Sequence, residues 1–152
     1  MTENDASTPV SERGALRRPA VLAWLRLARV YQRIERDSAR WLEPWDLSLA
    51  QFDVLAQVGA TAGMSQRELA EALLVTKGNV SQLVAKMERR GLLARSQDGR
   101  ALCLALTPEG RALHDRVVPA HERWLAERLG ALSREQLGRL ASLLRALDHA
   151  AM

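Results

Sequence analysis

Apolar side chains recur every three to four residues over most of the chain, which is the period of an amphipathic helix. After Thr76, for example, Val80, Leu83, Val84 and Met87 follow this spacing. The pattern predicts six helices separated by short connections. Their expected ranges are 20–43, 49–60, 66–72, 77–90, 108–129 and 134–149.

Capping signals stand at the ends of these ranges. Ser48, Ser65 and Ser133 each precede a Gln or Glu by three residues, which is typical of a capping box. Thr76 and Thr107 are further N-cap candidates, and a proline that suits the first helical position follows Thr107. The residues expected to end or bend helices are Pro44, Gly63, Gly91 and Pro119.

Two short strands are expected over residues 92–96 and 101–106. In the second, Leu102, Leu104 and Leu106 alternate with smaller residues, which is the period of a strand. Asp98-Gly99 lies between the two ranges and is a strong signal for a hairpin turn. The expected order is four helices, two strands and two helices.

This order predicts a mainly α fold with a small β-wing. The expected architecture is a winged helix-turn-helix domain over residues 47–106, flanked by dimerisation helices. The N-terminal dimerisation helix would span 20–46, and the C-terminal pair would span 107–152. Residues 1–19 are rich in small polar residues and proline, and they are expected to form a flexible arm.

Composition agrees with a nucleic-acid partner without proving one. The net charge is +4 and the isoelectric point is about 10.2, which favours a polyanionic partner. With one cysteine, the chain forms no internal disulfide, and this fits the reducing cytoplasm. No apolar run approaches the ~20 residues of a membrane span. The few, widely spaced His and Cys residues suggest no metal site or cofactor.

The second helix of the predicted helix-turn-helix is the expected reader of DNA. The major groove of B-DNA admits one α-helix, and Asn, Gln, Lys and Ser can all hydrogen-bond base edges or phosphates there. The apolar stripe faces the core, so the polar residues would face outward. No acidic residue lies between Thr76 and Lys86, which favours an approach to phosphate. The predicted DNA-binding residues are Ser65, Gln66, Thr76, Lys77, Gly78, Asn79, Ser81, Gln82, Lys86, Arg95 and Arg100.

A simpler interpretation is that this helix only has a solvated polar face. The basic hairpin that follows favours DNA binding, because Arg100 at its tip could reach the minor groove. For Arg95, a DNA contact and a strand-edge charge remain equally open.

Several motifs in this order resemble the MarR family of transcriptional regulators. They are "LSLAQFDVLAQV" from residue 47, "LAEALLVTKGNVSQLVAKMERRGLL" from residue 69, "DGR" at 98–100 and "LALTPEG" from residue 104. The resemblance covers about residues 20–149. The wing is a departure, because the family often has a longer tip with a second arginine beside the aspartate. A shorter tip leaves the depth of minor-groove contact open.

The resemblance implies a homodimer that reads a pseudo-palindromic duplex and, by family default, represses transcription. Independently, long Leu-rich terminal helices around a small central domain need a partner to bury their apolar faces. The alternative is that these helices pack together within one chain.

The resemblance also implies control by a small, often phenolic or anionic, effector. The candidate ligand-binding residues are Trp24, Trp41, Trp45, Phe52 and Asp53. The alternative for each Trp is a place in the core or the dimer interface. Urate-responsive members combine an early Trp with an Asp, which Trp24 and Asp53 could match. However, Gln82 stands where those members tend to have Arg.

Other interpretations are weaker. Peroxide-sensing relatives carry their cysteine near the first long helix, whereas Cys103 lies in the second predicted strand and is expected to be a small buried residue. No phosphate loop, metal cluster or nucleophile motif suggests an enzyme. His114, His121 and His149 are expected at surface or interface positions without evident partners. A protein-interaction adaptor is less favoured, because adaptors need not keep the 76–86 face free of acids.

Overall fold

A computed structural model describes residues 18–98 and 101–151, so residues 1–17 of the expected N-terminal arm and Arg100 lie outside the described residues. The chain divides into two units, residues 1–41 and 42–152. No described helix is long and apolar enough to span a membrane. Among the described residues, no group of three or more His, Cys, Asp or Glu could hold a metal ion.

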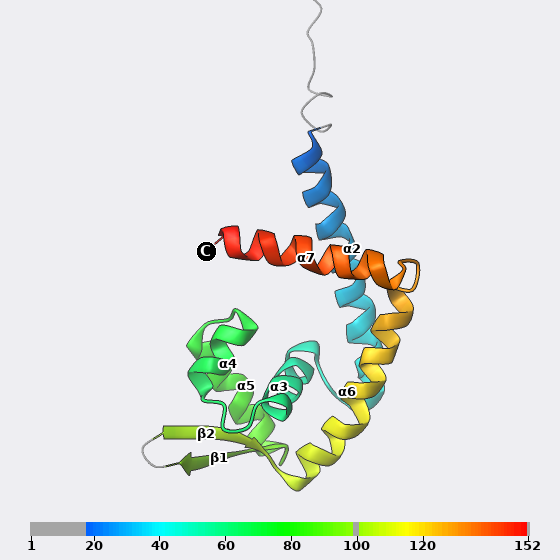
Figure 1. The fold of residues 1–152 in the computed structure, drawn as a ribbon. Helices are drawn as coiled ribbons and strands as arrows, with labels where there is room; N and C mark the ends of the chain where they lie inside the picture. The colour runs from blue at the N-terminus through cyan, green and yellow to red at the C-terminus, as the bar shows by residue number, and fades with distance from the viewer. Residues whose placement is uncertain (1–17, 99–100, 152) are drawn as a thin grey trace, which may run out of the picture. The chain divides into compact units, whose positions relative to one another are not determined.

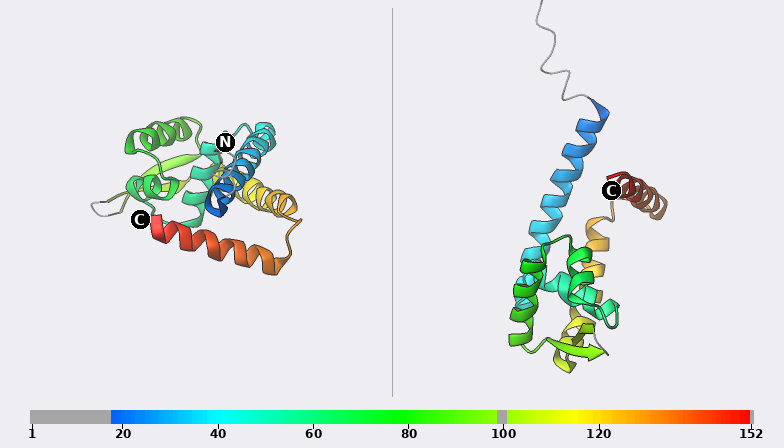
Figure 2. Two further views of the ribbon diagram at one scale, coloured as in Figure 1. Left: turned by 90° about the horizontal axis from the view of Figure 1, so that it is seen from above. Right: turned by 90° about the vertical axis from the view of Figure 1, so that its left-hand side faces the viewer.

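The described part of the first unit consists of one long helix. Helix α2 spans Pro19–Leu42 and is drawn as an uninterrupted helix in Figure 2. Its predicted range was 20–43, so both ends agree to within one residue. Pro44 lies inside a 3₁₀ turn, Glu43–Trp45, directly after the helix, as expected for a residue that cannot continue the α-helical hydrogen bonds.

The second unit begins with three short helices. Helix α3 spans Leu49–Ala60, α4 spans Gln66–Leu73 and α5 spans Lys77–Arg89 (Figure 1). The capping boxes predicted at Ser48 and Ser65 are both present, and the Thr76 side chain caps α5. The apolar stripe of α5 points into the core, where Val80, Val84 and Met87 are fully buried. The side chains that this packing leaves outside form the candidate site.

A two-stranded antiparallel hairpin follows, with β1 at Leu93–Asp98 and β2 at Ala101–Leu106. The predicted turn is off by one residue at its start. Asp98 belongs to β1 and pairs with Ala101, because the cross-strand ladder continues beyond the Gln97–Leu102 pair. The connection is therefore 99–100, which lies outside the described residues. In Figure 1 the hairpin projects from the three helices like a wing.

The outer edge of β2 is attached to the start of α4. The Leu104 N–H donates to the Met64 carbonyl at 2.7 Å, and Ser65 forms an isolated bridge with Cys103. This contact covers the centre of β2, so that Cys103 and Leu104 are both buried. The expectation that Cys103 is a small buried residue is confirmed.

Two longer helices complete the unit. Helix α6 spans Pro108–Arg128 and α7 spans Arg134–Ala151. Thr107 caps α6 as predicted, and Ser133 and Gln136 form the predicted capping box before α7. Helix α6 continues through Pro119.

Helix α6 packs against α3, and this packing corrects the expectation for His121. The His121 ring is only 9 % exposed and lies with its centroid 4.4 Å from the Phe52 ring. It also stacks on Trp124 at 5.2 Å. A surface position is therefore wrong for His121, because α6 turns this side chain toward α3. His114 is half-buried beside Gly59, and its Nδ1 lies 2.8 Å from the Asp115 carboxylate.

Candidate nucleic-acid interface

The turn between α4 and α5 sets the position of the predicted reading helix. Leu74 adopts a left-handed backbone conformation, with φ 53° and ψ 39°. The Val75 N–H then donates to the Ala70 carbonyl at 3.2 Å, and Thr76 begins α5. The Thr76 hydroxyl accepts a hydrogen bond from the Asn79 N–H at 3.3 Å. This cap satisfies one of the free N–H groups at the start of α5.

The polar side of α5 is open to solvent. Its predicted DNA-binding residues from Thr76 to Lys86 are all exposed. Among the described residues, the side chains of Lys77, Asn79, Ser81, Gln82 and Lys86 make no hydrogen bond or ion pair. Side chains that are not already engaged can form new hydrogen bonds without first breaking old ones. We call the exposed side of residues 76–86 the α5 polar face.

One residue of this surface was not among the sequence-predicted candidates. Arg89 is exposed in the last turn of α5, seven residues after Gln82 and three after Lys86. These spacings place the three side chains near one another on the helix. The helical spacing that identifies the apolar stripe also identifies Arg89 when it is followed along the polar side beyond Lys86.

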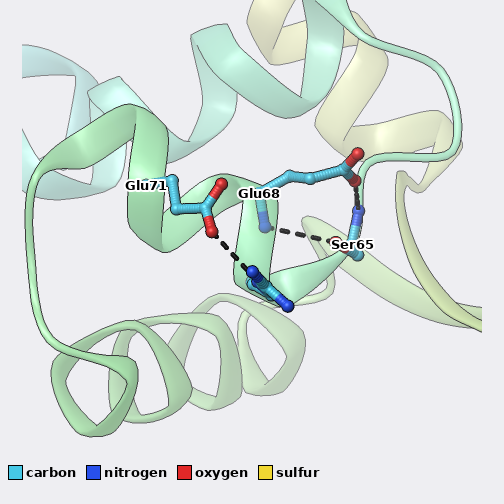
Figure 3. A network of polar contacts seen from close by, with 4 residues as sticks. Ser65, Glu68 and Glu71 are labelled. Atoms are coloured by element: carbon cyan, nitrogen blue, oxygen red, sulfur yellow. Dashed lines mark hydrogen bonds and ion pairs between the residues drawn. The ribbon is translucent and has the colours of Figure 1, made fainter.

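The start of α4 holds the two earlier candidates. The Ser65 hydroxyl accepts from the Glu68 N–H at 3.2 Å, and the Ser65 N–H donates to the Glu68 carboxylate at 2.7 Å (Figure 3). These bonds from Ser65 lower the pKa of Glu68, so the carboxylate remains charged beside the start of the helix. Arg67 pairs with Glu71 at 3.0 Å on the same helix. Ser65 is thus engaged in capping, and Gln66 is half-buried.

Arg95 is tied to the reading helix. Its Nε lies 3.2 Å from a carboxylate oxygen of Glu88, which links strand β1 to α5. To contact a phosphate, Arg95 would have to break its ion pair with Glu88 or bind Glu88 and the phosphate at the same time. Arg100 lies outside the described residues, so its contact stays a prediction.

A groove of about 390 Å³ runs between α3 and α5. We call it the α3–α5 groove. Most of its lining surface is apolar, and four of the lining residues have polar or charged side chains. The residues that line it are Ala50, Asp53, Leu73, Val75, Asn79, Gln82, Leu83 and Lys86. It therefore shares Asn79, Gln82 and Lys86 with the α5 polar face.

The five predicted ligand-binding residues are dispersed. Asp53 lines the α3–α5 groove, whereas Trp24 and Trp41 belong to the first unit. Trp45 is half-buried, with the Arg116 guanidinium 5.3 Å from its ring centroid. Phe52 fills the core next to His121. Of these five residues, Asp53 alone lines the groove.

Beyond Lys86, a more polar groove of about 420 Å³ lies beside the C-terminal end of α5. Arg90 lines it and donates to the Gln51 side-chain oxygen and to the Asp46 carboxylate, both at 3.2 Å. Gln51 is buried and also takes part in the α3 capping box. Arg90 thus fixes the end of the reading helix to the start of α3.

A helix-turn-helix pair with an exposed polar second helix and a β-hairpin wing defines the class of winged-helix DNA-binding proteins. A family model described as the MarR family matches residues 45–101. An uncharacterized HTH-type transcriptional regulator of Bacillus anthracis is 38 % identical over 98 residues, covering 64 % of this chain and 67 % of that protein. Transcriptional regulator HosA of Escherichia coli O157:H7 is 32 % identical over 118 residues, covering 75 % of this chain and 87 % of HosA.

Several solved structures share the fold of this chain. BpsR of Bordetella bronchiseptica is 28 % identical, with a TM-score of 0.74, covering 84 % of this chain and 98 % of BpsR. MepR of S. aureus in complex with DNA has a TM-score of 0.74 at 23 % identity, covering 83 % of this chain and 95 % of MepR. AbsC of Streptomyces coelicolor has a TM-score of 0.78 at 24 % identity, covering 86 % of this chain and 92 % of AbsC. The chain belongs to the MarR family: it is a DNA-binding transcriptional regulator and not an enzyme.

Proposed function

We propose that this regulator is a repressor that binds a pseudo-palindromic operator as a homodimer and is released by a small-molecule effector. The α5 polar face, with side chains left unengaged by the rest of the described chain, supports the operator contacts in this proposal. Asn79 and Gln82 would read adenines, and Lys77 and Lys86 would contact guanines or phosphates. Residues 47–106 would form the DNA-binding domain between the dimerisation segments 20–46 and 107–152.

The operator readout can be tested with Asn79→Ala and Gln82→Ala. A duplex selected from a random library by the wild-type protein serves as the specific site, and a scrambled duplex of equal length serves as the reference. Each substitution should cost about 1–3 kcal/mol of discrimination between the two duplexes. Ser142→Ala, which changes an exposed residue of α7, is the control and should retain discrimination. Equal wild-type affinity for both duplexes in fluorescence anisotropy would overturn the proposal.

Repression can be measured separately with a promoter that overlaps the selected duplex. Purified protein should lower transcription in vitro in proportion to operator occupancy, because a bound dimer would occlude the polymerase. A rise in transcription at full occupancy would identify an activator instead.

For the effector, we place the site in the α3–α5 groove. A ligand there would cover Asn79, Gln82 and Lys86, so DNA and ligand would compete for the same side chains. The largely apolar lining suits a small aromatic molecule, and the Lys86 ammonium suits an anionic substituent. In the similar protein BpsR, DNA binding is regulated by 6-hydroxynicotinic acid, which is a small aromatic acid.

A panel of aromatic carboxylates that includes 6-hydroxynicotinic acid can test this site. A compound that releases the operator should lose potency in Lys86→Ala, which removes the cation that would hold the carboxylate. It should keep or gain potency in Asp53→Ala, which removes a negative charge from the lining. Potency is measured by anisotropy, and binding by direct calorimetry. Trp45→Phe, outside the lining, is the control. If potency falls with Trp45→Phe and not with Lys86→Ala, the effector site is elsewhere.

A further inference from the structure

Helix α2 carries a one-sided row of arginines that the proposed operator contacts do not use. The row is Arg26, Arg29, Arg33, Arg36 and Arg40, which we call the arginine stripe. Successive members are three or four residues apart. At about 100° per residue, all five fall within a sector of about 80° around the helix axis. The stripe is about 21 Å long at the usual helical rise.

The stripe concentrates positive charge and leaves it unpaired. Helix α2 contains five arginines, no lysine and two acidic residues, Glu35 and Asp37. Every arginine of the stripe is exposed, and none makes a hydrogen bond or ion pair with another residue in the described ranges. Glu35 lies on the opposite side of the helix, where it accepts a hydrogen bond from Tyr31. Asp37 borders the stripe.

Five unpaired guanidinium groups in one row repel one another unless an anionic partner covers them. Guanidinium is the side-chain group that matches phosphate oxygens with two parallel hydrogen bonds. Duplex DNA presents one phosphate charge per about 1.7 Å of its axis, so the stripe runs beside about twelve of them. We propose that the arginine stripe is a second DNA-binding surface, which contacts the phosphate backbone without reading bases.

The geometry of the helix favours DNA over a membrane. A helix that lies on a membrane needs its apolar side for the acyl chains. The apolar side of α2, with Trp24, Leu27 and Tyr31, is the surface that the proposed dimer would bury. The inference rests on DNA binding by this family member, and it does not depend on the proposed operator contacts.

The test is the salt dependence of binding to a non-specific duplex. Arg29→Gln/Arg33→Gln/Arg36→Gln keeps helix propensity and removes three charges from the stripe. The slope of log K against log salt should fall by about 2–3 if each arginine contacts one phosphate. The control Arg134→Gln/Arg139→Gln/Arg145→Gln removes the same charge from α7 and should leave the slope nearly unchanged. The corresponding triple Arg→Lys variant should restore most of the slope.

An unchanged slope in the stripe variant, or an equal loss in the α7 control, would overturn the proposal. Sedimentation and circular dichroism establish that each variant keeps the wild-type assembly and helix content. If the triple variant does not fold, Arg33→Gln alone should lower the slope by about 1. Tighter binding of the wild type to vesicles of anionic phosphatidylglycerol than to DNA would instead assign the stripe to membranes. Discrimination of the wild type between operator and scrambled duplex is measured in a separate experiment. Failure of the proposed operator contacts would therefore not change the salt-dependence result for the arginine stripe.

Discussion

At the scale of single residues, Leu74 is the most unusual position in the helix-turn-helix. Its backbone is left-handed, and its side chain is 91 % exposed. A left-handed conformation costs about 1–2 kcal/mol for most residues that carry a Cβ, whereas Asn adopts it more readily. Leu74→Asn should therefore raise the free energy of unfolding by about 0.5–1 kcal/mol in urea denaturation. Leu74→Ala is the control, because it removes the apolar side chain and keeps the strained backbone. Equal gains in both variants would refute backbone strain as the cause.

His121 should make stability depend on pH. Burial beside Phe52 lowers the pKa of His121, and this outweighs the opposing effect of Glu122. A depressed pKa means that the unfolded chain binds the proton more tightly than the folded chain. Stability is therefore complete above the unfolded pKa of about 6.5 and is lost as the pH falls toward the folded pKa. Denaturation midpoints measured from pH 7.5 to 5 should decline less in His121→Leu than in the wild type. Parallel declines would show that other groups dominate.

At the scale of elements, the first turn of α6 packs closely against the backbone of Leu92, the residue before strand β1. A Cβ on Gly110 would overlap the Leu92 carbonyl oxygen, which is backbone and cannot rotate away. The Thr107 hydroxyl donates to the Gly91 carbonyl at the same junction. Gly110→Ala should therefore destabilise the protein by about 2 kcal/mol or more, although alanine is the better helix former. Gly78→Ala, whose Cβ would meet open space, should be neutral or slightly stabilising. A neutral Gly110→Ala in urea denaturation would mean that the two elements separate readily.

Helix and strand limits were largely predictable, because caps are local chemistry. Ser48, Ser65 and Thr76 begin helices where the sequence places them, since each side chain bonds only to residues three positions away. The wing was less predictable. The observed turn begins one residue later than predicted, because the pairing of β1 with β2 extends to Asp98. How far two strands pair depends on contacts between them.

At the scale of the whole molecule, several large apolar side chains of α2 and α7 are exposed to solvent. Leu143 and Leu147 of α7 are 66 % and 62 % exposed, and Trp24 of α2 is also exposed. Such surfaces indicate a partner, and we expect a second copy of the chain. Leu143→Glu/Leu147→Glu should convert the dimer to a monomer in sedimentation at micromolar concentration. Ser142→Glu, which lies about 100° or more from both leucines around the axis of α7, should remain dimeric. A wild-type monomer would contradict the dimer and favour packing of these helices within one chain.

The sequence by itself determined the element order, the caps, the family and the outward side of α5. These follow from periodicity and from hydrogen bonds that span only a few residues. The tertiary structure decided what each side chain meets across elements. It paired Arg95 with Glu88, buried His121 against Phe52, and placed Asp53 in a groove with Gln82. Such contacts depend on how helices pack, which local spacing does not encode.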